Sequence, residues 1–274
     1  MIPAATTMGA VELTVADLER SLAYYTRQIG LEVVDRDGGR ASLGAGGGGT
    51  LVELVEEPGA RPADGYAGLF HFALRVPQRV DLARWLAHAA RDGVALTGAS
   101  DHFVSEALYL RDPDHHGIEI YWDRPRELWE GRVDRMTTLP LDVQDLLAEV
   151  DDDEFDGLPG ATDMGHVHLR VADVDDAVRF YGDALGFELM VRFGAQAAFL
   201  SAGGYHHHVG ANTWESRGAP PAPEGTARLR RATVVLPDAA ERDRLTSALP
   251  HEDTDAGPLV RDPSGNGIVL AVVQ

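Results

Sequence analysis

The chain contains one ten-residue stretch twice: Met8-Gly-Ala-Val-Glu-Leu-Thr-Val-Ala-Asp17 and, with changes, Met164-Gly-His-Val-His-Leu-Arg-Val-Ala-Asp173. Residues 8–33 and 164–189 share ten identities in 26 aligned positions. A repeat of this length marks a duplicated structural unit, so it decides the fold before any other feature. The differences between the copies are informative as well. Ala10 of the first copy is His166 in the second, and histidine is a common metal ligand.

Each copy begins a βαβββ pattern. In the first copy, Gly9–Val15 alternates apolar and polar residues, which predicts a half-buried strand. Residues 18–29 carry an apolar stripe at helical spacing, with Asp17 as the expected N-cap and Gly30 as the expected C-cap. The strands expected after this helix are 31–35, 40–43 and 50–55.

The same pattern recurs three more times along the chain, so we expect four modules. The third module starts at His166 and the fourth, which is weaker, at Arg228. We expect a first domain over 8–124, a helical and acidic linker over 125–160, and a second domain over 164–274. Within the linker, Leu141–Val150 is expected to be helical and to pack against the first half. The elements expected in the second module are strand 69–76, helix 80–90 and strands 94–97, 106–110 and 117–122.

Composition limits the classes of function. The chain has 274 residues, 44% hydrophobic residues, no cysteine and a net charge of −20, which disfavours nucleic acids and anionic membranes as partners. Any metal site must therefore use His, Asp and Glu. Lacking cysteine, a long apolar run and a signal sequence, the chain is expected in the cytoplasm. The acidic run 151–156 is expected to be a solvated linker.

The repeated pattern resembles the vicinal oxygen chelate superfamily, which includes glyoxalase I, bleomycin-resistance proteins and extradiol dioxygenases. The residues that carry the resemblance are His166, Leu169, Val171, Asp173, Phe180-Tyr181 and Leu185-Gly-Phe187. The resemblance implies an α+β fold in which four βαβββ modules pair into two incomplete barrels, with the helices outside. Four modules fit the extradiol dioxygenases, and segments 68–73, 101–114 and 204–210 resemble the bacterial catechol 2,3-dioxygenases.

In that superfamily, metal ligands come from the first strand of each paired module and from the last strand of one module. The corresponding positions here hold Ala10, His71, His166 and Arg231 in the first strands, and Glu119 and Val269 in the last strands. Pairing modules two and three would unite His71, His166 and Glu119, which is the facial triad of non-haem Fe(II) oxygenases. Modules one and four would hold Ala10, Arg231 and Val269, which do not bind a cation. Glu53 is then a structural or surface carboxylate.

Strand alternation supports this triad, because side chains on one strand point to opposite faces in turn. His71 lies opposite Phe70, Phe72, Leu74 and Val76. His166 and Glu119 likewise lie opposite the apolar residues of their own strands. All three are therefore expected to face the concave side of the sheet.

The run His206-His207-His208 is expected in the last strand of module three, where alternate side chains face the cavity. We favour His206 and His208, because His207 then shares the opposite face with Val209. In this position His206 and His208 would bind substrate or act as acid–base groups.

Two further residues precede Glu119. Tyr109 lies ten residues before it, as in the extradiol family, and His102 lies further upstream at a slightly different spacing. The resemblance implies that both donate hydrogen bonds to the substrate or to dioxygen. His115 and His116 follow Pro113 and are expected to be exposed turn residues.

The function implied is an extradiol dioxygenase that uses Fe(II), with Mn(II) as the alternative metal, to insert O2 into catechol or a related aromatic diol during aromatic hydrocarbon catabolism. Homo-oligomers are common in the superfamily. Two other classes stay open: a glyoxalase-type metal-dependent lyase or isomerase, and a metal-free drug-binding protein like those of bleomycin resistance. Ala10 argues against the first of these, and the His/His/Glu set argues against the second.

Overall fold

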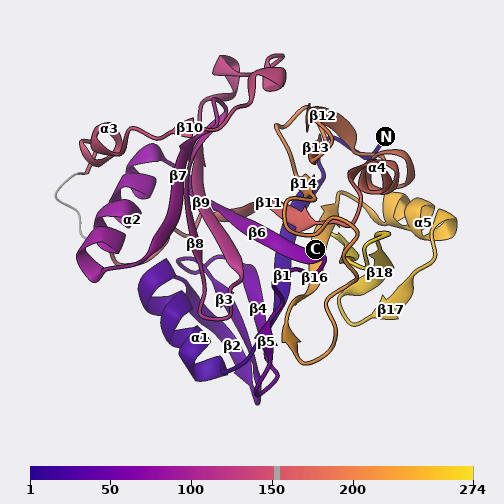
Figure 1. The fold of residues 1–274 in the computed structure, drawn as a ribbon, viewed down its shortest axis with the longest axis horizontal. Coiled ribbons are helices and arrows are strands. Elements are labelled where there is room, and N and C mark those ends of the chain that lie inside the picture. Colours follow the sequence, from indigo (N-terminus) through magenta and orange to yellow (C-terminus); the bar gives the residue numbers. More distant parts are fainter. Residues whose placement is uncertain (151–154, 274) are drawn as a thin grey trace.

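The computed structural model describes residues 1–150 and 155–273. Its described strands form two large sheets and one small one (Figure 1). The first large sheet has the order β17 (Glu252–Thr254), β18 (Gly257–Arg261), β19 (Gly267–Val272), β16 (Leu229–Leu236), β1 (Thr7–Val15), β4 (Thr50–Glu56), β3 (Arg40–Gly44) and β2 (Glu32–Asp37). The second has the order β10 (Leu139–Pro140), β7 (Leu96–Asp101), β8 (Ser105–Arg111), β9 (Gly117–Asp123), β6 (Gly68–Arg75), β11 (Asp163–Arg170), β14 (Val209–Asn212), β13 (Ala197–Ser201) and β12 (Glu188–Phe193). The small sheet pairs β15 (Thr226–Ala227) with β5 (Arg61–Pro62).

Each large sheet combines strands from both halves of the chain. β1 pairs antiparallel with β16, so modules one and four share a sheet. β6 pairs antiparallel with β11, so modules two and three share the other. We call these sheets the terminal half-barrel and the central half-barrel, respectively. The expected α+β fold of four paired modules is confirmed, and the two middle modules pair as the ligand positions require.

The helices lie outside the sheets, at the left and right margins of the molecule in Figure 1. They are α1 (Leu18–Tyr24), α2 (Arg79–Asp92), α3 (Val143–Leu147), α4 (Val174–Val178) and α5 (Ala239–Ala248). Asp17 caps α1 by accepting a hydrogen bond from the amide of Arg20. The helix expected over 18–29 changes to a π-helical turn at Tyr25–Ile29 and ends at Gly30, whose φ of 89° suits a residue without Cβ. A second π-helical turn, Arg179–Ala184, follows α4.

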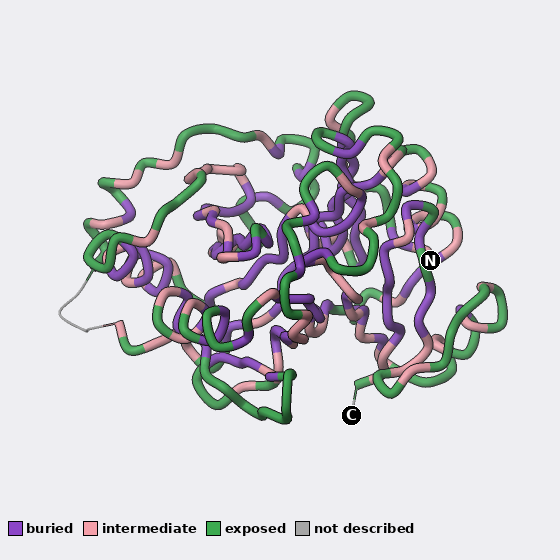
Figure 2. Tube along the Cα trace, turned by 60° about the horizontal axis from the view of Figure 1, so that its bottom comes forward, coloured by how far each residue is buried: buried purple, intermediate pink, exposed green. Residues whose placement is uncertain are grey.

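The apolar faces of both half-barrels pack under these helices. In β6, Phe72 and Leu74 are fully buried, and Val167 and Leu169 of β11 are buried beside them. Figure 2 shows the buried backbone in the middle of the molecule and exposed residues mainly on the connecting loops. The opposite, concave face of the central half-barrel carries both polar and apolar side chains.

Two matching hydrogen bonds clasp the half-barrels together. The Tyr25 hydroxyl of module one donates to Asp112 Oδ2 of module two at 3.0 Å, and Tyr181 of module three donates to Asp262 Oδ2 of module four at 3.1 Å. The other oxygen of each aspartate accepts two backbone N–H groups of its own turn. Burial raises the pKa of both aspartates above the ordinary value.

The segment between the halves differs in part from expectation. The expected helix over 141–150 is only the five residues of α3, which packs on α2. Much of the expected acidic linker, 151–154, lies outside the described residues, and Phe155 stacks on His88. The division into domains 8–124 and 164–274 stays a prediction. No described helix is both long enough and apolar enough to cross a membrane.

Candidate metal centre

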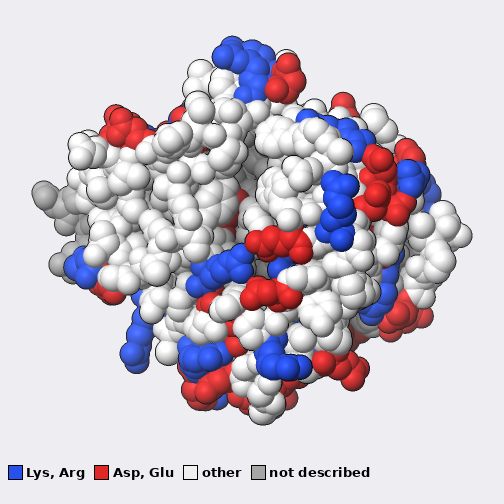
Figure 3. All heavy atoms as spheres, viewed as in Figure 1, with Lys and Arg blue, Asp and Glu red and all other residues white. Residues whose placement is uncertain are grey.

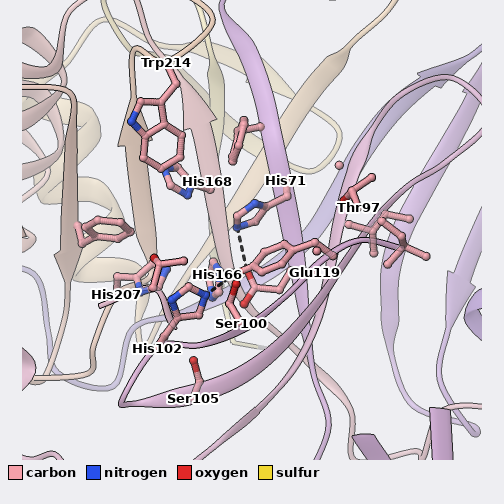
Figure 4. A pocket seen from close by; sticks show the side chains of 18 of the residues that line it. His71, Thr97, Ser100, His102, Ser105, Glu119, His166, His168, His207 and Trp214 are labelled. Atoms are coloured by element: carbon pink, nitrogen blue, oxygen red, sulfur yellow. Dashed lines mark hydrogen bonds and ion pairs between the residues drawn. The ribbon is translucent and has the colours of Figure 1, made fainter. Parts of the chain in front are cut away.

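Three adjacent strands of the central half-barrel bring two imidazoles and a carboxylate together. Ala73 of β6 is flanked by His166 of β11 on one side and by Glu119 of β9 on the other. His71 lies two residues before Ala73 and therefore on the same face. Nε2 of His71 and Nε2 of His166 lie 2.9 Å and 3.1 Å from Glu119 Oε2. Figure 4 shows the three side chains pointing toward one another. All three side chains are buried.

The donor set fits a divalent metal ion. Although His71 Nε2 is close to Glu119, the contact lacks hydrogen-bond geometry. Among the described residues, His71 Nε2 and His166 Nδ1 are buried without a hydrogen-bond partner. An unpaired buried polar atom is costly, so such atoms indicate a missing partner such as a metal ion or water. No other group of three His, Asp or Glu side chains in the described part of the chain has ligand atoms this close together.

Electrostatics favour the protonation states that a metal ion requires. Burial lowers the pKa of His166 to about 4, so at neutral pH its ring is an uncharged ligand. Burial alone would raise the pKa of Glu119, but His166 and His71 hold it well below the ordinary value. Two neutral imidazoles and one carboxylate leave a divalent ion with a formal charge of +1.

Two β-bulges shape the cavity in front of this site. The pairing of β6 with β11 skips Phe70 and Gly165, so each lies outside the regular ladder. The prediction that Phe70 shares the buried face of Phe72 was therefore wrong. Phe70 lines the cavity beside His71, with ring centroids 5.4 Å apart.

Tyr109 and His102 lie together on the cavity wall. The His102 Nδ1 lies 2.7 Å from the Thr137 carbonyl and its Nε2 lies 2.7 Å from the Tyr109 hydroxyl. A carbonyl only accepts, so Nδ1 carries the proton, and Nε2 of the neutral ring accepts from Tyr109. Burial, and then Glu119, raise the pKa of Tyr109 well above the ordinary value, so its hydroxyl stays protonated. The two predicted residues are thus both placed at the cavity.

The histidine run takes a different orientation from the one we expected. His207, rather than His206 or His208, lines the cavity, and its ring centroid is 4.0 Å from that of His166. The reason is local: β14 begins only at Val209, so the run lies in the preceding turn, where strand alternation does not hold. His206 bonds instead to Asp123, and His208 to Ser201.

Sequence reasoning missed His168, which also lines the cavity. Its Nε2 is buried with no hydrogen-bond partner in the described part of the chain, and its ring packs edge-on against His71 at 5.0 Å. Gly210 makes room for this ring, because a Cβ there would lie 2.8 Å from it. His168 lies two residues after His166 on the same strand, so strand alternation could have predicted that both face the cavity.

The cavity has a volume of about 450 Å³ and a mixed lining. Phe199 and Trp214 form an apolar side around His168, with ring centroids 5.4 Å and 5.5 Å from it. Figure 4 shows Trp214 beside His168. His115 is exposed, as expected, but His116 is buried because its Nε2 lies 2.8 Å from the Thr14 carbonyl of the terminal half-barrel. Neither of these two lines the cavity.

The terminal half-barrel carries an ion-pair cluster at the matching place. Glu12 pairs with Arg231 across β1 and β16, as His168 pairs with His71 across β11 and β6. The Glu12 carboxylate is buried and contacts Arg40, Arg230 and Arg231 at 2.7–2.9 Å. Glu53 lies 3.5 Å from Arg231, which fits the expected structural role. Elsewhere acidic and basic groups mix on the surface, with uncharged side chains beside the hollow in Figure 3.

Known proteins resemble both the sequence and the fold. Residues 7–120 and 163–270 match the Glyoxalase/Bleomycin resistance protein/Dioxygenase superfamily model. The Catechol-2,3-dioxygenase of Bacillus subtilis (strain 168) is 42% identical over 279 aligned residues, which cover 98% of each chain. A crystal structure assigned to a Bacillus subtilis dioxygenase superposes with a TM-score of 0.68 at 16% identity, covering 99% of this chain and 86% of that one. Glyoxalase I of Zea mays superposes with a TM-score of 0.57 at 18% identity, covering 97% and 92%. These two structures support the fold alone.

Proposed function

We infer that this chain, which belongs to the Glyoxalase/Bleomycin resistance protein/Dioxygenase superfamily, is a dioxygenase that cleaves the ring of catechol or a related aromatic diol. The observation that carries this function is the convergence of His71, His166 and Glu119 in a cavity that also holds three imidazoles and a phenol. The name of the 42% identical relative supports the same reaction.

The proposed metal is Fe(II), bound by His71, His166 and Glu119, with Mn(II) as the alternative. Two histidines and one carboxylate with further positions open form the ligand set of non-haem Fe(II) oxygenases. A metal ion held there would supply Lewis acidity toward the two diol oxygens and, as Fe(II), a route for electrons from the diol to dioxygen.

The remaining groups of the cavity bind and orient the diol. The Tyr109 hydroxyl, which stays protonated, donates its single hydrogen to His102, so its oxygen would accept a hydrogen bond from a diol hydroxyl beside Glu119. His207 approaches from the β14 side, next to His166, and would accept a hydrogen bond from the second hydroxyl. His207 therefore replaces His206 and His208 as the proposed acid–base residue of the run.

The apolar side of the cavity would contact the aromatic ring. Phe70, Phe199 and Trp214 surround His168 there, and aromatic faces exclude water from a bound ring. The Nε2 of His168 is buried among these rings without a hydrogen-bond partner in the described part of the chain and can be offered to the ligand. We propose that it positions the substrate.

The experiment that tests this function loads the purified protein anaerobically with Fe(II) and then adds catechol and air-saturated buffer. We expect oxygen uptake with stoichiometric formation of a yellow ring-fission product. Resorcinol is the matched control, because its hydroxyls are not adjacent and do not chelate one ion. Protein that retains Fe(II) or Mn(II) but consumes no oxygen with any of several substituted catechols would contradict the function. The cytoplasmic location and the oligomeric state stay predictions.

A further inference from the structure

A chain of hydrogen bonds leads from the cavity to the end of β9. His207, which lines the cavity, has its Nδ1 2.7 Å from Nδ1 of His206. The Nε2 of His206 lies 2.8 Å from Oδ1 of Asp123, the last residue of β9. His206 is fully buried, so these two contacts are its polar environment. The geometry links a cavity residue to a carboxylate through one intervening ring.

Asp123 is an acceptor at both oxygens. Its Oδ2 receives the Tyr205 hydroxyl at 2.8 Å and Arg75 Nη1 at 3.1 Å, while Oδ1 receives only His206. Burial opposes its charge, but His206, Arg75 and Tyr205 lower the pKa of Asp123 below the ordinary value. An ionised carboxylate has no proton to donate, so His206 must carry its proton on Nε2.

The remaining protons follow from this assignment. When the proton on Nε2 is the only proton of the His206 ring, its Nδ1 presents a lone pair. The short Nδ1–Nδ1 contact then requires a proton on Nδ1 of His207. No described carboxylate hydrogen-bonds or ion-pairs with His207, so a second proton on this buried ring would be an unpaired charge. Nε2 of His207 is left as the unprotonated nitrogen.

We propose that Asp123 and His206 are positioning residues that hold His207 in the Nδ1–H tautomer, so that its Nε2 accepts a hydrogen bond from a hydroxyl of the bound diol. That a diol hydroxyl is the partner of His207 Nε2 rests on the proposed function, whereas the tautomer of His207 does not. With the opposite tautomer, Nε2–H could only donate, and His207 would offer the substrate hydroxyl no acceptor. The same dependence on a second-layer carboxylate is known for histidine bases and metal ligands in general.

Asp123→Asn is expected to reverse the direction of donation in the hydrogen bonds that join residue 123, His206 and His207. The amide oxygen of Asn should take the Oδ2 position, because two donors, Tyr205 and the charged Arg75, point there. The amide NH2 then faces His206 Nε2 and donates to it. His206 must in turn donate from Nδ1 to His207 Nδ1, which moves the His207 proton to Nε2.

Nitrogen-15 NMR of the metal-free protein reads these tautomers directly, without any turnover. Two-bond nitrogen–hydrogen correlations distinguish the two neutral forms, and loss of signal in His207→Gln identifies the ring among eleven histidines. We expect Nδ1–H in the wild type and Nε2–H in Asp123→Asn. A wild-type Nε2–H tautomer, or no change in Asp123→Asn, would overturn the proposal.

Activity of the iron-loaded variants gives the second measurement. Asp123→Asn should lower kcat about 10²–10⁴-fold, with KM and iron content within about threefold of wild type. Asp163→Asn is the matched control, because Asp163 bonds the other edge of Arg75 and touches neither histidine. It should leave kcat and the His207 tautomer unchanged. Equal losses in both variants would mean that the network is merely structural.

His206→Leu covers the case in which Asp123→Asn does not fold. Leu has no polar side-chain atom, so both the bond to Asp123 and the acceptor for His207 are removed. We expect a mixture of both His207 tautomers and an intermediate loss of kcat. A single unchanged tautomer would contradict the proposal. If the wild type shows the expected tautomer but no dioxygenase activity, the positioning holds and only the proposed function fails.

Discussion

The central and terminal half-barrels are built from the same module, yet among the described residues only the central one presents a candidate set of metal ligands. His71 and His168 face one another across two strands of the central half-barrel, and Arg231 and Glu12 do so in the terminal one. The arginine neutralises its carboxylate partner directly, whereas the imidazoles leave buried nitrogens without a partner in the described part of the chain. The same fold can therefore keep buried nitrogen atoms unpaired at a proposed ligand site. At the matching position of the terminal half-barrel, an ion pair satisfies the buried carboxylate instead.

The largest difference between the half-barrels is expected when a proposed metal ligand of the central one is removed. His166→Ala should abolish both iron retention and turnover, because even residues that only orient metal ligands are worth about 10–100-fold in affinity. Iron content after gel filtration and oxygen uptake measure the two effects. Ala10→His is the matched change on the terminal side and should bind no second iron. Full iron content in His166→Ala would show that the site is wrongly assigned.

A stability test addresses the terminal half-barrel. Glu12→Gln should lower the free energy of unfolding by about 3 kcal/mol, because it leaves a buried cluster of arginines without its shared carboxylate. Iron affinity should stay within about threefold, since Glu12 lies in the other sheet. Urea unfolding and iron titration provide the two numbers. A large fall in iron affinity at unchanged stability would mean that the half-barrels are not independent in the way described.

A smaller effect is expected where the two half-barrels differ in side-chain size. Gly210 lies beside His168, and Glu53 occupies the matching position beside Glu12. Gly210→Ala should cost about 1–3 kcal/mol of stability and raise KM, because the new methyl group would displace the His168 ring. Gly39→Ala, with its nearest atom at 3.6 Å, is the control and should change neither quantity. An unchanged KM for Gly210→Ala would remove His168 from the substrate site.

The smallest effects should come from the two tyrosine–aspartate hydrogen bonds that join the half-barrels, which are alike in geometry. Tyr25→Phe and Tyr181→Phe should each lower the free energy of unfolding by about 1–2 kcal/mol through loss of one buried hydrogen bond. The losses should add in the double variant, because the two contacts share no residue. Thermal or urea unfolding measures them. Clearly unequal losses of unfolding free energy in the two variants would show that the two contacts between the half-barrels are not equivalent.

Much of the fold followed from the repeat, because modules with equal hydrophobic patterns must use equal strand pairings. The pairing of modules two and three was predicted from where His71, His166 and Glu119 occur, and the sheet order confirms it. The use of the triad as a metal site stays a prediction. Strand alternation predicted the wrong side-chain direction only where the chain leaves the regular ladder. These places are the bulge at Phe70 and the turn before β14, which directs His207 into the cavity.

The crossed pairing of the modules has a consequence for synthesis on the ribosome. Thr7 of β1 pairs with Val235 of β16, 228 residues later (235 − 7). At about 5–20 residues per second, β1 waits on the order of 10–50 s for this partner. β6 waits in the same way for β11. The first half of the nascent chain therefore leaves the ribosome with two open sheet edges, on which neighbouring chains can add strands. Rapid delivery of the second half, or a chaperone that covers these edges, would decide the yield of folded protein.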